Sequence, residues 1–172
     1  MQPSTKVETH TRASEQRQYL TFTLAGEQFA VGTLTVKEII EYGQVTSVPM
    51  MRPSIRGVIN LRGAVVPVID LGARFGGRQT EIGRRTCIVI LEVDSADEQQ
   101  VIGVLVDAVN EVLEISPVDI EPPPAFGAHI RTDFILGMGK VEGRFVILLD
   151  IGKVLSVDEL AALTQIQETP GD

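Results

Sequence analysis

One pattern occurs twice in the chain, as VVPVIDLG at residues 65–72 and as FVILLDIG at residues 145–152. Further matches keep the same order, and their offset grows from 73 to 80 residues because an insertion accumulates around the prolines at 122–124, where a loop is easily lengthened. These matches are residues 36–41 with 109–114, 55–57 with 135–137, and Gly63 with Gly143. Self-similarity of this kind indicates a duplicated structural unit, so the sequence predicts two lobes of similar plan.

Each copy reads as a series of about five β-strands. The chain holds 21 Val and 16 Ile, and these β-branched residues favour pleated sheets, so we expect an all-β fold. Two of the strands, 64–69 and 145–149, are apolar on both faces and require burial on both sides. The expected strands are 19–24, 28–31, 38–48, 57–61 and 64–71 in the first copy, and 87–93, 101–106, 111–120, 137–141 and 144–151 in the second.

The ends of the chain carry a weaker pattern. Residues 1–17 are polar, and Ser156–Glu159 forms a capping box that favours the start of a short C-terminal helix. We expect a disordered tail over 1–17, lobe one over about 18–85, lobe two over about 86–155, a helix over about 157–166 and a frayed tail over 167–172.

Composition excludes several kinds of site and partner. The net charge of −8 and the absence of Trp make nucleic acid a poor partner, since phosphates would be repelled and few rings could stack on bases. The single cysteine, Cys87, forms no intramolecular disulfide, and neither His10 nor His129 has metal-ligating neighbours at a suitable spacing. No apolar run approaches the length of a membrane span. We expect a cytoplasmic protein with no metal, no cofactor and no direct membrane insertion.

Charge is divided unevenly along the chain. Residues 1–51 carry a net −1, residues 52–85 a net +5 and residues 86–172 a net −12. This asymmetry favours oriented contacts with protein partners. For the arginines between Arg74 and Arg85, a solvated loop is the favoured interpretation.

Motifs of common catalytic sites are missing from the sequence, including a phosphate-binding Gly-rich loop and a nucleophile elbow. Asp70 and Asp150 occupy equivalent strand ends, where a carboxylate commonly accepts turn amides, and we favour this role over an acid/base pair. Cys87 lies in an apolar run, where a thiol behaves as a small hydrophobe. An enzyme that uses Asp70, Asp150 or Cys87 is the least favoured alternative.

The densest motif, GVINLRG at 57–63 followed by AVVPVIDL at 64–71, resembles the CheW family of bacterial chemotaxis coupling proteins. The similarity runs from about Gln18 to Leu163. The same motif occurs in the regulatory domain of the kinase CheA and in the first domain of CheV, but this chain has no kinase or receiver domain, which favours a stand-alone coupling protein. Supporting stretches lie at residues 18–22, 29–31, 36–39 and 102–109.

The resemblance implies two five-stranded SH3-like β-barrel lobes packed on a shared apolar groove. It also implies a non-enzymatic adaptor, monomeric when free, that couples the cytoplasmic tips of methyl-accepting chemoreceptors to the regulatory domain of the histidine kinase CheA in receptor arrays. The alternative is a CheW-like scaffold of a parallel chemosensory pathway that controls pili or a second messenger. No cofactor is implied.

By position, the resemblance assigns residues to a receptor-binding site and to kinase-binding surfaces. Arg62 suits a glutamate or a carbonyl on a receptor helix tip, because its guanidinium presents a planar fork of donors; an intramolecular pair with Glu38 is the alternative. Val45 and Phe126 are expected at roughly corresponding places after the repeated segments in the two copies. Glu121 stands where a common family member has arginine, which either removes a second kinase contact or implies a partner of reversed charge. The assigned residues are Val36, Glu38, Arg62, Cys87 and Val104 for the receptor, and Tyr42, Val45, Val48, Glu121 and Phe126 for the kinase.

Overall fold

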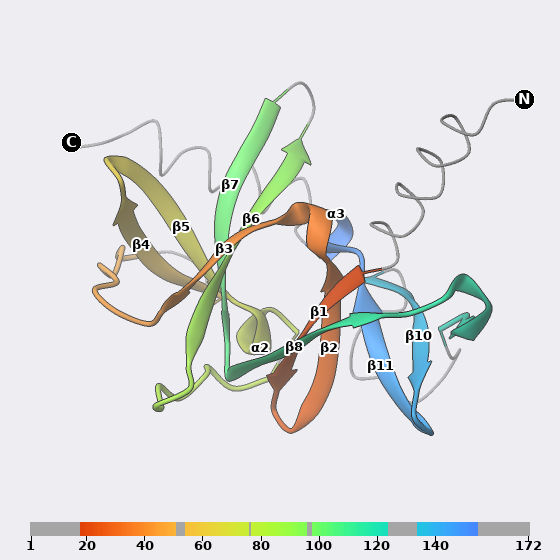
Figure 1. The fold of residues 1–172 in the computed structure, drawn as a ribbon. Helices are drawn as coiled ribbons and strands as arrows, with labels where there is room; N and C mark the ends of the chain where they lie inside the picture. The colour runs from red at the N-terminus through yellow and green to blue at the C-terminus, as the bar shows by residue number, and fades with distance from the viewer. Residues whose placement is uncertain (1–17, 51–53, 76, 96–97, 124–133, 155–172) are drawn as a thin grey trace, which may run out of the picture.

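A computed structural model describes residues 18–50, 54–75, 77–95, 98–123 and 134–154 of the chain (Figure 1). Most of these residues lie in two β-sheets, which confirms the expected all-β fold. The strands are β1 (Gln18–Leu24), β2 (Glu27–Gly32), β3 (Val36–Glu41), β4 (Ile55–Leu61), β5 (Ala64–Asp70), β6 (Cys87–Ser95), β7 (Glu98–Val106), β8 (Ala108–Glu114), β9 (Ile120–Glu121), β10 (Ile135–Val141) and β11 (Arg144–Leu149). The helical turns are η1 (Thr33–Thr35), α2 (Leu71–Arg74), η2 (Pro117–Asp119) and α3 (Ile151–Val154).

The two sheets divide the chain differently from the expected lobes. A five-stranded sheet with the order β3-β6-β7-β5-β4 uses consecutive strands from residues 36 to 106, and we call it the central lobe. A six-stranded sheet with the order β8-β1-β2-β11-β10-β9, the outer lobe, joins the two flanks of the chain. The expected boundary near residues 85 and 86 is therefore replaced. The division differs because β2 pairs in parallel with β11, so that Phe29 lies opposite Ile147. Local sequence pattern does not specify a partner strand that lies so far away in the chain.

The duplication is nevertheless visible in the order of the strands. In each sheet a hairpin, β1–β2 or β6–β7, lies between an edge strand, β8 or β3, and a second hairpin, β10–β11 or β5–β4. The two hairpins meet through a parallel ladder in both sheets. The irregularities recur as well, since each edge strand shifts register once against its neighbour, and β4 and β10 shift after Ile55 and Ile135.

The glycine of the repeated tripeptide allows two backbones to approach closely. Thr46, after β3, exchanges two backbone hydrogen bonds of 2.8 and 2.9 Å with Val58 of β4. A Cβ built on Gly57, whose φ is 151°, would lie 2.2 Å from the carbonyl oxygen of Thr46. On Gly137 it would lie 2.6 Å from a methyl carbon of Ile120, in the chain that crosses β10. Both glycines therefore let the chain that leaves one edge strand reach the opposite edge of its sheet.

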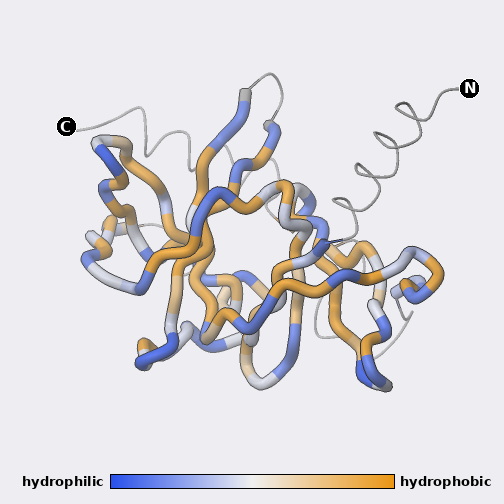
Figure 2. Tube along the Cα trace, in the orientation of Figure 1, coloured by the Kyte–Doolittle hydropathy of each residue, from blue (hydrophilic) through white to orange (hydrophobic). Residues whose placement is uncertain are grey.

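Apolar side chains of the described residues form three clusters, of which the largest fills the seam between the two sheets. Strand β6 shows why, because alternate residues serve different clusters: Ile88 and Ile90 point into the central lobe, whereas Val89 and Leu91 point into the seam. Figure 2 shows hydrophobic residues along the strands and hydrophilic residues at the hairpin tips. Strand β5 is buried over its last five residues, in agreement with its pattern of apolar residues on both faces.

A row of phenylalanine rings crosses the seam. The ring centroids of Phe22 and Phe29 lie 6.2 Å apart, those of Phe29 and Phe75 5.8 Å, and those of Phe75 and Phe134 6.2 Å. Phe75 directly follows α2 of the central lobe, whereas the other three rings belong to the outer lobe. The guanidinium of Arg74 lies 5.0 Å from the centroid of the Phe134 ring. The row therefore links the two lobes through aromatic contacts. Such contacts stabilise a fold by more than the burial of the same apolar surface would.

Two expected strands are shorter than their pattern suggests. The strand expected over 38–48 ends at Glu41, and that expected over 111–120 ends at Glu114, because the chain there leaves the sheet to reach its opposite edge. In the described parts of the chain, neither α2 nor α3 has the length and hydropathy of a membrane-spanning helix. The expected C-terminal helix, both tails, His10 and His129 lie outside the described residues.

Candidate partner-binding site

Glu38 and Arg62 form a bidentate ion pair on the central lobe. Nη1 of Arg62 donates to Oε2 of Glu38 at 2.5 Å, and Nη2 donates to Oε1 at 3.0 Å. Glu38 lies in β3, one edge of the sheet, and Arg62 lies in the turn that follows β4, the other edge. The sheet therefore curves until a side-chain contact joins its two edges.

The turn that carries Arg62 fixes where its side chain begins. Arg62 and Gly63 have φ values of 53° and 88°, the left-handed conformation that tight hairpins require at both central positions. The Asn60 side chain accepts a hydrogen bond of 2.9 Å from the amide of Gly63 and stabilises the turn. The side chain of Arg62 is 72% exposed and that of Glu38 is 26% exposed. The guanidinium is thus held in one orientation while its outer face remains open to solvent.

The ion pair also sets the protonation of both groups. The hydrogen bond from Arg62 lowers the pKa of the Glu38 carboxyl below its ordinary value, and the charge of Arg62 acts in the same direction. The hydrogen bond to Glu38 raises the pKa of the Arg62 guanidinium. Both groups are therefore charged at neutral pH, and the N–H groups of Arg62 that do not bind Glu38 can donate to a carboxylate or carbonyl of a partner.

The other three receptor-site candidates lie on the opposite face of the same sheet. Glu38 is opposite Ile90, which points into the central lobe, whereas Val36, Cys87 and Val104 pack against the seam cluster. Val36 and Cys87 are half-buried, but Val104 is only 1% exposed. The structure thus brings Glu38 and Arg62 together and places Val104 beneath the surface, where its packing supports the neighbouring strands.

Two exposed residues on this seam-facing side were missed by sequence reasoning. Ile39 lies opposite Val89 and is 42% exposed, and Val112 lies opposite Leu20 and is 55% exposed. Each occupies the same position in the repeated segments 36–41 and 109–114, and that match is the signal that could have found them. They extend the apolar seam onto the surface at β3 and at β8.

The kinase-surface candidates fall in both lobes. Tyr42 and Val45 pack against the interior cluster of the central lobe, and Val48 is half-buried in the same connection to β4. Glu121 is exposed in β9 of the outer lobe, beside β10, and Figure 1 shows β4 and β10 on opposite sides of the molecule. Phe126 lies outside the described residues.

Among the described residues the counterpart of Val45 lies in the chain that crosses β10, whereas Phe126 lies outside them. A Cβ on Gly57 would meet Val45 Cγ1 at 2.9 Å, and a Cβ on the equivalent Gly137 would meet Ile120 Cγ2 at 2.6 Å. Ile120 is therefore the counterpart of Val45. The sequence could not reveal this, because the insertion around the prolines hides the register of the two connections.

Asp70 serves the fold. Its side chain is fully buried and accepts hydrogen bonds from the amide of Thr80 at 2.7 Å, the hydroxyl of Thr80 at 2.8 Å and the amide of Ala73 at 3.3 Å. Nη1 of Arg56 lies 3.4 Å from the same carboxylate. With both oxygens engaged, Asp70 caps α2 and anchors the loop at Thr80, as expected of a turn-capping carboxylate.

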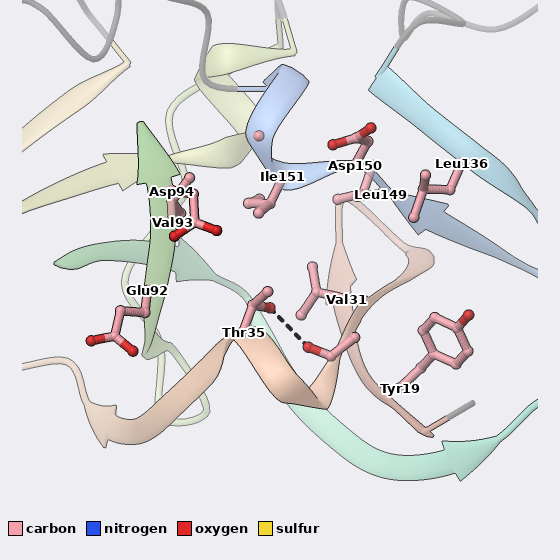
Figure 3. A pocket seen from close by; sticks show the side chains of 12 residues that line it. Tyr19, Val31, Thr35, Glu92, Val93, Asp94, Leu136, Leu149, Asp150 and Ile151 are labelled. Carbon is pink, nitrogen blue, oxygen red and sulfur yellow. Dashed lines mark hydrogen bonds between the residues drawn. The ribbon is translucent and has the colours of Figure 1, made fainter. Parts of the chain in front are cut away.

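A groove of about 370 Å³ opens where the lobes meet near α3 (Figure 3). Buried apolar side chains are among its lining residues, and three carboxylates lie at its rim. Within the described residues, no group of three or more His, Cys, Asp or Glu side chains could hold a metal ion. The buried apolar lining residues are Val31, Val93, Leu149 and Ile151, the exposed Leu136 also lines the groove, and the carboxylates belong to Glu92, Asp94 and Asp150.

The chain is similar to known proteins over most of its length. The model of the CheW-like domain matches residues 18–159, which is most of the chain. The chain belongs to the CheW family. Its fold is similar to the crystal structure of the scaffolding protein TtCheW from Thermoanaerobacter tengcongensis, with a TM-score of 0.74, 33% identity, and coverage of 84% of this chain and 90% of that one.

Two CheW relatives match over most of their length. The chemotaxis protein CheW of Klebsiella aerogenes is 35% identical over 153 residues, with coverage of 89% of this chain and 90% of the relative. The chemotaxis protein CheW of Rhizobium meliloti is 34% identical, with coverage of 85% and 92%. In this CheW-family chain the motif at 57–71 has a structural basis, since it holds the close-approach Gly57, the turn at Arg62 and the buried Asp70.

Proposed function

We propose that this chain is a non-enzymatic adaptor that couples methyl-accepting chemoreceptors to the histidine kinase CheA in the cytoplasm. The observation that carries the proposal is the CheW-family match over residues 18–159, together with relatives whose names place them in chemotaxis. The exposed Arg62 gives the adaptor a directional donor for an acidic or carbonyl-bearing receptor surface.

An adaptor needs separate surfaces for its two partners, and the proposed residues provide them. The receptor surface comprises Glu38, Arg62 and the exposed side of the seam at Val36 and Cys87, with Val104 in support. The kinase surfaces lie in the connections that follow the two edge strands. One contains Tyr42, Val45 and Val48 in the central lobe, and the other contains Glu121 in the outer lobe and, beyond the described residues, Phe126.

The structural use of Asp70 supports a non-enzymatic role, because all of its acceptor positions serve turns and Arg56. Its counterpart Asp150 directly precedes α3 in the other lobe, so the two carboxylates cap separate helices. An enzyme that relied on Asp150 would lose activity in Asp150→Asn. We expect that variant to retain full receptor control of the kinase.

The test is reconstitution of a chemoreceptor, CheA and this protein, with kinase activity as the readout. Arg62→Glu reverses the charge at the proposed contact and is expected to weaken receptor binding by about thirty-fold or more, the loss typical of a broken charge-assisted pair at an interface. Arg144→Glu, at an exposed position next to the equivalent turn of the outer lobe, is the matched control. Unchanged coupling by folded Arg62→Glu would overturn the assignment.

A further inference from the structure

The loop between α2 and β6 presents basic side chains at the surface. Its residues 77–86, which we call the arginine loop, contain three arginines and one acidic residue, Glu81. The exposed arginines are Arg78, Arg84 and Arg85. Ile82, between them in the chain, is 43% exposed. The loop therefore combines a net positive charge with an apolar side chain at the surface of the central lobe.

Buried threonines hold the arginine loop in place. Thr80 donates to the carboxylate of Asp70 through its amide at 2.7 Å and through its hydroxyl at 2.8 Å. The carbonyl oxygen of Thr80 accepts from Nη1 of Arg56 at 3.3 Å, and the hydroxyl of Thr86 accepts from the amide of Gly83 at 2.7 Å. Loops that bind partners are commonly positioned by a rigid scaffold. Such anchoring also reduces the conformational entropy that binding must remove.

The arginine loop lies beside the kinase surface proposed for the central lobe. The amide of Tyr42 donates to the carbonyl oxygen of Thr86 at 3.2 Å, which continues the pairing of β3 with β6. Figure 1 shows this part of the central lobe on the side of the molecule opposite β10 and β11. The connection from Tyr42 to Met50 contains no charged residue, and Met50 is fully exposed. An uncharged surface thus adjoins a basic one.

We propose that the arginine loop is the basic rim of this kinase surface and binds an acidic patch on the histidine kinase. The inference rests on the proposed adaptor function and deepens it by naming the chemistry of the partner. Protein interfaces typically have an apolar centre that is poor in charge and a polar rim, and arginine is enriched in them. Continuity through the Tyr42–Thr86 hydrogen bond favours the kinase over the receptor as the partner.

The rim charges and the apolar side chain should affect different rate constants. Charges of opposite sign steer two proteins together, so the arginines should raise the association rate in a salt-dependent way. Loss of an apolar contact acts mostly on dissociation, so Ile82 should set how long the complex lasts. Together these effects distinguish a docking loop from arginines that only add to the net charge.

Binding of the full chain to immobilised CheA, measured at several salt concentrations, tests the proposal. Arg84→Gln with Arg85→Gln is expected to slow association about five- to ten-fold at low salt, to flatten its salt dependence and to leave dissociation within about two-fold. Arg84→Lys with Arg85→Lys keeps both charges and should keep the native association rate. Ile82→Ser is expected to raise the dissociation rate about three-fold or more.

Arg144→Gln with Lys153→Gln is the matched control, since it removes two charges from exposed positions of the outer lobe. It is expected to leave association close to native. The proposal is wrong if the two arginine-loop substitutions leave association unchanged, or if the control slows it equally. An effect confined to binding of a chemoreceptor, or of a second copy of this chain, would also overturn it. Failure of the native chain to bind CheA at all would refute the adaptor function itself.

Discussion

Glu38 and Arg62 are 24 residues apart in the chain, and their ion pair joins the two edge strands of one sheet. An exposed ion pair contributes little to stability in general. Its bidentate geometry, however, holds the guanidinium of Arg62 in a single orientation before any partner arrives. Pre-orientation reduces the entropy that binding must remove from a long side chain. Arg62 can thus stabilise the lobe through its pair with Glu38 and also donate hydrogen bonds to a receptor.

Titration of Glu38 provides the first prediction. Because Arg62 lowers the pKa of Glu38 in the folded state, the pair stabilises the fold at neutral pH, and this contribution is lost as the pH falls through the lowered pKa. The carboxyl carbon of Glu38, followed by NMR, is expected to titrate with a midpoint below 4.5, its ordinary value. In Arg62→Gln the midpoint returns toward 4.5. An unshifted midpoint in the native chain would show that the pair does not form in solution.

Gly57 gives a prediction about backbone packing. Gly57→Ala places a Cβ against the Thr46 carbonyl and is expected to reduce the free energy of unfolding by about 3 kcal/mol, measured in urea. Gly63→Ala is the control, since it has a left-handed φ of 88° but open space around the new Cβ. That control is expected to cost about 1 kcal/mol from backbone strain alone. Equal losses in the two variants would contradict the close approach.

Asp70 and Asp150 are equivalent helix caps that differ in burial, since Asp70 is fully buried and Asp150 is half-buried. Asp70→Ala leaves the amide and the hydroxyl of Thr80 without their acceptor at a fully buried site, and it removes the carboxylate partner of Arg56; we expect a loss of about 3–5 kcal/mol. Asp150→Ala removes the equivalent cap near the groove, with an expected loss of about 1 kcal/mol. Chemical denaturation of the two variants measures both values, and a smaller loss for Asp70→Ala would refute its anchoring role.

Two glutamates stand in the outer lobe at the positions equivalent to Glu38 and Arg62, and the duplication indicates how to build the ion pair there. Glu111 is held at Thr21 by hydrogen bonds of 3.1 and 2.8 Å, at the position that Glu38 has opposite Ile90. Glu142, with a φ of 50°, occupies the turn position of Arg62. Glu142→Arg is therefore expected to pair with Glu111 and to raise the free energy of unfolding by about 0.5 kcal/mol at low salt.

Controls distinguish that new pair from simple loss of a negative charge. Glu142→Gln removes the charge alone and is expected to give a smaller gain. Adding Glu111→Gln to Glu142→Arg cancels the gain if the two side chains meet. A gain that persists in this double variant would mean that Glu111 and residue 142 do not interact.

Local pattern in the sequence predicts the strands well but not their partners. The repeated segments 65–72 and 145–152 each end a strand and start a short helix, because alternation and turn chemistry are local properties. Which strand lies beside β2 depends on the match of whole faces across the seam, which no local pattern encodes. The Glu38–Arg62 pair was one of two alternatives for the same reason. Val104 was assigned to a surface, whereas its place in a central strand buries it.

The strands of the central lobe lie in the chain between the strands of the outer lobe. The two lobes therefore become complete in a fixed order during translation. Every strand of the central lobe has been synthesised once the ribosome passes Val106, whereas the sheet of the outer lobe waits for β11, which ends at Leu149. Domains usually fold in the order of their synthesis. The hairpin β1–β2, which carries Phe22 and Phe29, therefore lacks its partner strand β11 while the whole central lobe is being synthesised. The first two strands to leave the ribosome, β1 and β2, thus form the hairpin that waits longest for its last neighbouring strand.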